Sequence, residues 1–190
     1  MILHLIRHGK TRANEQRLYC GQTDLSLSEV GIRDLSVLKE KVTYPSASLY
    51  VVSGLARTIE TAQLLFDDPP LTVASQLQEM NFGAFEMRHY DELKSDLAYQ
   101  KWINNIDQVN PPGGESKEAF TRRVINGLLQ VEKLGTLKQI NQVVVVTHGG
   151  VIATIMEHYF PGKKSFYEWQ PACGRGHSVD LGENRGYKCI

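Results

Sequence analysis

The stretch Val143-Val144-Val145-Val146-Thr147-His148-Gly149-Gly150 sets an unbroken apolar run directly before a histidine and two glycines. Four valines in succession are typical of a strand that is buried on both faces, as strands of parallel sheets are. The apolar segment after Gly150 favours a helix that reaches about His158. This part of the chain therefore predicts a strand, a tight turn and a helix, in that order.

The same order occurs near the beginning of the chain. The segment Ile2–Ile6 reads as a short buried strand, and Arg7-His8-Gly9 follows it. Further on, Ser26 and Glu29 have the spacing of a capping box, and apolar residues then recur at helical intervals up to Val42. We expect a helix there.

A third unit lies between residues 49 and 66. Leu49–Val52 predicts a strand, and Ser53-Gly54 leads into a helix that contains Arg57 and ends near Phe66. Three repeats of strand, turn and helix favour an α/β fold. We therefore predict three layers, with a mainly parallel central sheet flanked by helices.

The region from about residue 79 to 134 breaks this alternation. It predicts two helices, around 90–106 and 115–134, separated by Pro111-Pro112-Gly113-Gly114. We interpret it as a small helical cap inserted in a single domain that spans residues 1–190. The segment 178–190 predicts a β-hairpin that turns through Glu183-Asn184-Arg185-Gly186.

Composition excludes several classes of protein. The 190 residues carry 21 Lys plus Arg and 21 Asp plus Glu, a net charge of zero, so the chain lacks the overall field of a typical nucleic-acid binder. No apolar run suits a signal peptide or a membrane span. The three cysteines, Cys20, Cys173 and Cys189, form no CxxC pair and suit a reducing compartment. We expect a cytoplasmic protein with no membrane partner.

Cationic and imidazole side chains follow the predicted strands. Ligands of open α/β sheets bind beyond the carboxyl ends of the strands, where Arg7, His8, Arg57 and His148 would meet. Two guanidiniums so close together repel each other unless an anion lies between them, and they suit phosphate oxygens. The sequence therefore predicts a site for a phosphoryl group.

Binding alone does not need two histidines. Neighbouring arginines disfavour protonation of an imidazole, which leaves a ring nitrogen free to attack phosphorus. The other histidines, His4, His89, His158 and His177, have no HxxxH or HExxH spacing, so we expect structural roles for them and no metal site.

An ordered set of motifs resembles the histidine phosphatase superfamily, whose fold is called phosphoglycerate mutase-like. The motifs run in the family's order along nearly the whole chain. They are Arg7-His8-Gly9-Lys10-Thr11 with Asn14, Ser53-Gly54-Leu55-Ala56-Arg57, Leu77-Gln78-Glu79 with Phe82-Gly83, Gly113-Gly114-Glu115-Ser116, and Thr147-His148-Gly149-Gly150.

The resemblance implies roles for individual residues and requires no cofactor. His8 would be phosphorylated transiently, and Glu79 would donate and accept the proton. Arg7, Arg57 and His148 would hold the phosphoryl oxygens. Further substrate contacts are expected from Asn14, Gly21, Gln22, Thr23 and Gly149.

A narrower resemblance concerns the segments 79–89 and 119–124, which are similar to the α-ribazole-5′-phosphate phosphatase family. It implies that the small-molecule partner is α-ribazole 5′-phosphate, a phosphate monoester used in cobalamin nucleotide-loop assembly. Aromatic cap residues could then stack on its flat base. The candidates for stacking are Phe82, Phe85, Tyr90 and Trp102. Helical periodicity instead favours packing for Trp102, Ile106, Phe120, Val124 and Leu128.

Other functions stay open at this point. A broad-specificity sugar or phosphoglycerate phosphatase would use the same site, and so would a phosphoglycerate mutase that retains a bisphosphorylated cofactor. A sensor that binds a phosphorylated metabolite without turnover belongs to another class. The presence of both His8 and Glu79 argues against that class, since binding needs neither a nucleophile nor a proton donor. The sequence makes no prediction of the oligomeric state.

Overall fold

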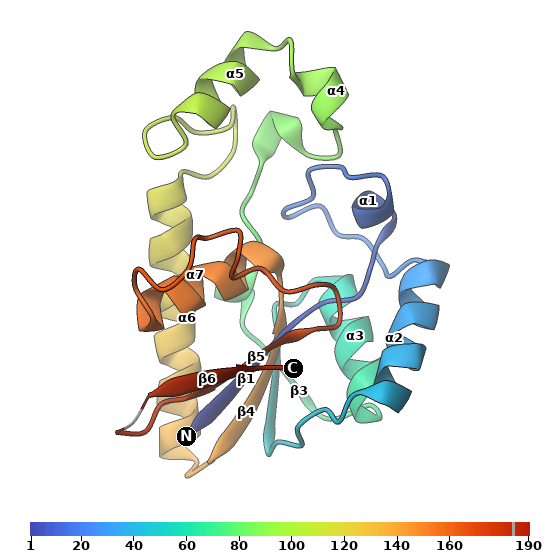
Figure 1. Cartoon of the computed structure of the whole chain (residues 1–190), viewed down its shortest axis with the longest axis vertical. Coiled ribbons are helices and arrows are strands. Elements are labelled where there is room, and N and C mark those ends of the chain that lie inside the picture. The colour runs from blue at the N-terminus through green and yellow to red at the C-terminus, as the bar shows by residue number, and fades with distance from the viewer. Residues whose placement is uncertain (184) are drawn as a thin grey trace.

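A computed structural model describes residues 1–183 and 185–190 of the chain (Figure 1). One sheet in this part of the chain has six strands in the order β3-β2-β4-β1-β5-β6. The strands are β1 (Ile2–Arg7), β2 (Leu49–Val52), β3 (Leu71–Val73), β4 (Gln142–Thr147), β5 (Gly176–Asp180) and β6 (Gly186–Cys189). The helices are α1 (Arg12–Glu15), α2 (Glu29–Lys41), α3 (Ala56–Phe66), α4 (Tyr90–Leu93), α5 (Leu97–Asn104), α6 (Lys117–Leu137) and α7 (Gly149–Tyr159), with 3-10 turns η1 (Ser75–Leu77) and η2 (Gly83–Phe85).

The sheet is mainly parallel, as predicted. β4 lies between β1 and β2 and pairs in parallel with both, while β2 pairs in parallel with β3. The antiparallel part is the pair β5 and β6, which extends the sheet beyond β1. Because the carboxyl ends of β1, β2 and β4 lie at one edge, the residues that follow them come together there.

The valine run of β4 explains the three layers. Val143 and Val145 pack in the apolar cluster that contains residues of α6 and α7, whereas Val144 and Val146 pack with residues of α2 and α3. Successive side chains of a strand point to opposite faces, so a strand covered on both faces needs apolar residues at every position. Figure 1 shows α2 and α3 on one side of the sheet and α6 and α7 on the other.

The start of α2 differs from the predicted capping box. The N-cap is Ser28, whose hydroxyl accepts a hydrogen bond from the N–H of Gly31, and not Ser26. Contacts from distant segments select this residue, because the Ser28 N–H donates to the carbonyl of Lys10 and the Leu27 N–H donates to Glu60. Spacing within the segment could not reveal these partners.

The cap is smaller than predicted. Instead of one helix over 90–106 there are two short helices, α4 and α5, which lie apart from the sheet at the top of Figure 1. The second predicted cap helix, 115–134, is α6, and its residues Val124, Leu128 and Val131 pack in the same cluster as the strands. Helix α6 therefore belongs to the central layers, and the cap consists mainly of residues 79–116.

Other differences concern short elements. Strand β3 was not predicted, because three residues after Pro69-Pro70 carry too little pattern, yet it pairs with β2. The hairpin of β5 and β6 is present, and it begins at Gly176. The predicted turn includes Asn184, which lies outside the described residues. In the described ranges, no helix combines the length and apolar character needed to cross a bilayer.

Candidate active site

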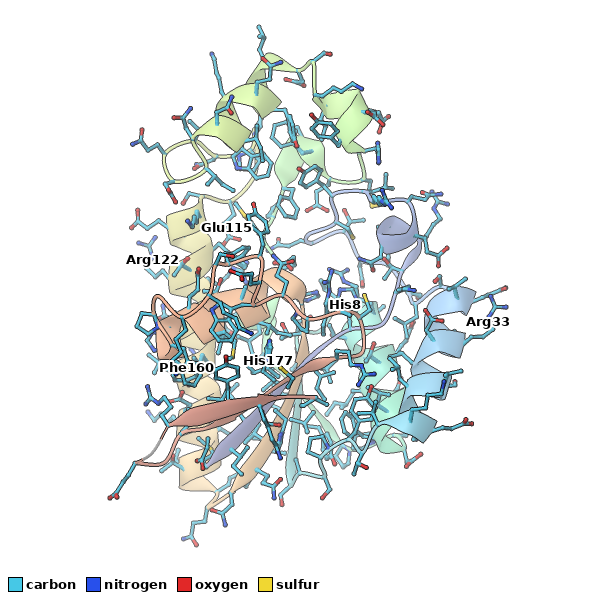
Figure 2. The ribbon with its side chains drawn as sticks, in the orientation of Figure 1. His8, Arg33, Glu115, Arg122, Phe160 and His177 are labelled. Carbon is cyan, nitrogen blue, oxygen red and sulfur yellow. The ribbon has the colours of Figure 1, made fainter. Side chains whose placement is uncertain are left out.

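The two histidines predicted to act together lie side by side. His8 follows the last residue of β1, and His148 is the N-cap of α7 directly after β4. Their ring centroids are 5.1 Å apart, with the rings inclined by 63°. Figure 2 shows His8 at the upper end of the sheet as drawn, in the middle of the molecule. Parallel pairing of β1 and β4 brings the two rings together.

The hydrogen bond of His8 fixes which nitrogen carries the proton. Nδ1 lies 2.6 Å from the carbonyl oxygen of Gly9, which can only accept, so Nδ1 is protonated. Burial, together with the positive charge of Arg57, lowers the pKa of His8 to about 3. A neutral imidazole holds one proton, so Nε2 carries a free lone pair. His8 therefore presents a nucleophilic nitrogen.

A chain of hydroxyl groups fixes the proton of His148 in the same way. The Thr58 hydroxyl donates to the carbonyl of Leu55 at 2.8 Å, so it accepts from Ser53 at 3.1 Å. The Ser53 oxygen then accepts from Nε2 of His148 at 2.9 Å. Burial, followed by the proximity of His8, holds the pKa of His148 well below its ordinary value. Its buried Nδ1 has no hydrogen-bond partner among the described residues and remains for a ligand.

The two arginines are held by backbone carbonyls. Arg57, on the first turn of α3, is 1% exposed, and its two Nη atoms donate to the carbonyls of Gly21 and Thr23 at 2.5 and 2.8 Å. Arg7 donates from Nη1 to the carbonyl of Pro171 at 2.9 Å. Within the described part of the chain the buried Nε of Arg7 has no partner. A guanidinium has more N–H donors than these bonds use, so both side chains can also bind an anion.

The carboxyl group of Glu79 lies at the start of α7. Its Oε2 accepts from the N–H of Gly150 at 2.9 Å, and Oε1 accepts from the N–H of Met80. Loss of water around the group raises the pKa of Glu79, although both backbone bonds and the two arginines oppose the shift. A raised pKa suits a carboxyl group that must donate a proton.

The paired glycines of α7 make room for these groups. A Cβ on Gly150 would lie 2.4 Å from Oε1 of Glu79, and a Cβ on Gly149 would lie 3.2 Å from Cζ of Arg7. Any side chain at Gly150 would displace the carboxyl group. The Gly149-Gly150 pair is thus a requirement of the site as well as the beginning of a helix.

The described protonation state can be tested in the ligand-free protein. We expect the ring of His8 to stay neutral from about pH 8 down to about pH 5, because a lowered pKa means that protonation occurs only in stronger acid. Nitrogen NMR of histidine-labelled protein in phosphate-free buffer measures this, with His8→Gln used to assign the signal. A His8 titration centred near the ordinary value of 6.5 would contradict the description.

The predicted substrate contacts fall into two groups. Asn14 uses Oδ1 to accept from the N–H and the hydroxyl of Thr11, which leaves its amide nitrogen free to donate to a ligand. Gly149 lies beside Arg7. The N–H groups of Gly21, Gln22 and Thr23 all donate to the carboxylate of Glu86. Those three N–H groups are therefore not available to a ligand in this structure.

Sequence reasoning missed the residues that hold Glu79 in place. Arg123, on α6, donates to the carbonyls of Gln76, Gln78 and Glu79, and it forms an ion pair with Glu115 at 2.7 Å. Figure 2 shows Glu115 near the end of α6 below the cap. The neighbouring Arg122 forms only an exposed pair with Glu118. The spacing of Arg122 and Arg123 in the sequence does not show which of the two turns inward.

Most aromatic residues of the cap pack against one another. Phe85 and Trp102 are buried in one cluster with Leu93 and Tyr99. The prediction that Phe85 or Trp102 stacks on a ligand is therefore wrong for this structure. The prediction of packing is confirmed for Trp102 and Ile106 in the cap cluster, and Phe120, Val124 and Leu128 also pack, but in the main core. Tyr90 is 55% exposed, and Phe82 is partly buried.

Three of the four remaining histidines make structural hydrogen bonds, and the ring of His158 lies 5.2 Å from that of Tyr159. His4 bonds to Ser178 and Gln142, His177 bonds to the carbonyl of Trp169, and His89 caps α4 by accepting from the N–H of Asp91. Across residues 1–183 and 185–190, no group of three or more His, Cys, Asp or Glu side chains is placed to hold a metal ion.

Comparisons with known proteins agree with this geometry. The model of the histidine phosphatase superfamily (branch 1) matches residues 3–179, and the chain belongs to that family. An adenosylcobalamin/alpha-ribazole phosphatase from Escherichia coli (strain K12) is 34% identical over 160 residues, which are 82% of this chain and 77% of that protein.

Solved structures extend the comparison. The alpha-ribazole phosphatase from Shigella flexneri has a TM-score of 0.83 at 29% identity, over 96% of this chain and 92% of that one. A phosphoglycerate mutase from Bacillus anthracis shares the fold, with a TM-score of 0.79 at 22% identity over 94% of this chain and 87% of that one. The matched family and its alpha-ribazole phosphatase relative show that the chain belongs to an enzyme family of phosphatases.

Proposed function

We propose that the protein is a phosphomonoesterase that works through a phosphohistidine at His8. One observation carries the proposal: a neutral His8, with its proton on Nδ1, lies among Arg7, Arg57 and a carboxyl group of raised pKa. This combination provides a nucleophile, an anion site and a proton donor in one place. Each of them is needed for transfer of a phosphoryl group from an alcohol to a histidine.

In the first step Nε2 of His8 attacks phosphorus, and the bond between phosphorus and the ester oxygen breaks. Glu79 gives its proton to the leaving oxygen, so the product is a neutral alcohol and Glu79 becomes a carboxylate. Arg7 and Arg57 balance the charge of the phosphoryl oxygens. The Nδ1 lone pair of His148 can accept a hydrogen bond from the protonated oxygen of a monoanionic phosphate ester, since the Nε2 proton is committed to Ser53.

In the second step water attacks the phosphohistidine. The Glu79 carboxylate removes a proton from the water, the N–P bond breaks, and the electron pair returns to Nε2 of His8. Inorganic phosphate leaves, and the enzyme returns to its starting protonation state. The bond from Nδ1 to the Gly9 carbonyl persists through both steps and keeps the ring oriented.

The proposed substrate is α-ribazole 5′-phosphate, and the product is α-ribazole. The relatives named as α-ribazole phosphatases support this choice, since they cover most of the chain. The small cap, α4 and α5, lies apart from the sheet on the side of the site (Figure 1). Of the four aromatic cap residues considered for stacking, Tyr90 is the one with an exposed side chain, at 55%.

A substrate panel tests the proposal. We expect kcat/KM for α-ribazole 5′-phosphate to exceed the values for 3-phosphoglycerate and simple sugar phosphates by at least about tenfold, because a specific pocket adds about 1.4 kcal/mol or more. Inorganic phosphate should be released in one-to-one ratio with the alcohol. Comparable rates for all esters would indicate a broad-specificity phosphatase. Isomerised phosphoglycerate without phosphate release would indicate a mutase, and binding without turnover would indicate a sensor.

A further inference from the structure

The carboxylate of Glu86 gathers more hydrogen bonds than Glu79 does. Glu86 follows the turn η2 in the cap and accepts from the N–H groups of Gly21, Gln22, Thr23 and Phe82 at 3.0 to 3.2 Å. It also accepts from the hydroxyl of Thr23 at 2.7 Å. Backbone groups from two separate parts of the chain thus meet on one side chain.

The segment 21–23 has a second set of bonds on its other side. The carbonyls of Gly21 and Thr23 accept from the two Nη atoms of Arg57 at 2.5 and 2.8 Å. The N–H groups of the segment therefore face Glu86 while its carbonyls face Arg57. A Cβ on Gly21 would lie 1.7 Å from the carbonyl oxygen of Met80, so this close arrangement requires glycine.

Further backbone hydrogen bonds join the chain just before residue 21 to the chain just after Glu86. Tyr19 exchanges backbone hydrogen bonds with residues just after Glu86: its N–H donates to Arg88, and its carbonyl accepts from Met87. Leu18 and His89 form an isolated antiparallel bridge. The chain before residue 21 is thereby tied to the cap immediately beyond Glu86.

We propose that Glu86 is the positioning residue for Arg57, acting through the segment 21–23. Arg57 points two N–H donors at the carbonyls of that segment, so the direction of its remaining donors depends on where those carbonyls lie. Glu86 sets their position in two ways: it holds the N–H of Gln22, which is in the same peptide group as the Gly21 carbonyl, and it holds the N–H and hydroxyl of Thr23, the residue that carries the other carbonyl. The inference rests on the proposed function, because it assumes that Arg57 binds the phosphoryl group.

Glu86 is not a second proton donor. Burial alone would raise its pKa, but the hydrogen bonds from Thr23, Phe82, Gly21 and Gln22 lower it below the ordinary value. Glu79 has the opposite shift. The pKa values of Glu79 and Glu86 are thus shifted in opposite directions, which suits the two carboxyl groups to different roles. Glu86 accepts hydrogen bonds from several donors and stays ionised.

The test uses Glu86→Gln, which keeps the size of the side chain and removes one acceptor oxygen and the charge. We expect kcat/KM to fall about 10- to 100-fold with Arg57 present, and by less than about twofold when Arg57→Ala is also present. The loss should be equal for p-nitrophenyl phosphate and for an alkyl phosphate. The dissociation constant of inorganic orthovanadate should rise by a similar factor, because Arg57 is one of its partners.

Glu92→Gln is the matched control. Glu92 is a carboxylate of the same cap that accepts from the N–H of His89 and, in the described part of the chain, makes no bond to the segment 21–23. We expect its kcat/KM to stay within about twofold of the unmodified protein. Circular dichroism checks that each variant is folded, and Glu86→Asp replaces Glu86→Gln if the latter is not.

Each outcome separates this inference from the proposed function. A protein that neither binds orthovanadate nor hydrolyses esters would overturn the proposed function. If the protein is active and the fold losses in kcat/KM from Glu86→Gln and Arg57→Ala multiply in the double variant, this inference is overturned while the proposed function stands. A larger loss for the alkyl ester than for p-nitrophenyl phosphate would show that Glu86 acts as a proton donor, and this would also overturn it.

Discussion

Replacement of His8 by alanine should abolish turnover, with a fall in kcat of at least about 10³-fold, equivalent to about 4 kcal/mol of barrier. No other described side chain combines a free ring nitrogen, two neighbouring guanidiniums and the orienting bond to Gly9. The other imidazole of the site, His148, also has an unpartnered ring nitrogen among the described residues, Nδ1, which we assign to a phosphoryl oxygen and not to phosphorus. Release of inorganic phosphate from a saturating phosphate ester measures the effect.

His4→Gln is the control for this variant. His4 is a buried histidine of β1, the strand that directly precedes His8, but its ring bonds to Ser178 and Gln142, away from the site. Activity per folded molecule should remain within a few-fold of the unmodified protein. If His8→Ala kept most of its activity while His4→Gln lost it, the assignment of the nucleophile would be wrong.

Glu79→Gln should lower kcat/KM for an alkyl phosphate by about 10²- to 10⁴-fold, the usual contribution of general acid catalysis. An alkoxide leaves poorly without a proton, whereas p-nitrophenolate leaves well. The loss for p-nitrophenyl phosphate should therefore be much smaller. This comparison is made with kcat/KM because that quantity reports the first chemical step and not the hydrolysis of the phosphohistidine.

The pH dependence provides an independent check on Glu79. Its raised pKa means that the acid form persists to higher pH than for an exposed glutamate, and activity toward the alkyl ester should decline as the pH rises through that pKa. The decline should disappear in Glu79→Gln. An equal loss for both esters, with an unchanged pH profile, would show that Glu79 only binds or supports the structure.

The central strands and the residues that follow them could be predicted because their signals are local. The valine run of β4 needs apolar neighbours on both faces, and parallel pairing then brings His8 beside His148. Arg57 follows β2 on the first turn of α3. For these elements the order along the chain nearly determines the place in the fold.

The supporting residues could not be predicted, since their partners are backbone groups of distant segments. Glu86 bonds to N–H groups at positions 21 to 23, and Arg123 bonds to carbonyls at positions 76 to 79. Every residue except proline offers such groups, so they leave no pattern in the sequence. Ser28 replaced Ser26 as the cap of α2 for a similar reason, because Lys10 and Glu60 hold the preceding turn. Helix α6 was assigned to the cap because the pattern of one helix does not say which layer it joins.

Trapping of the phosphoenzyme tests the central claim most directly. The protein is mixed with a phosphate ester, quenched in denaturing base within milliseconds, digested and examined by mass spectrometry. The account predicts phosphate on the peptide that contains His8, stable in base and lost in acid, and absent in His8→Ala. Rapid turnover with no phosphorylated histidine, or with phosphate on another residue, would contradict it.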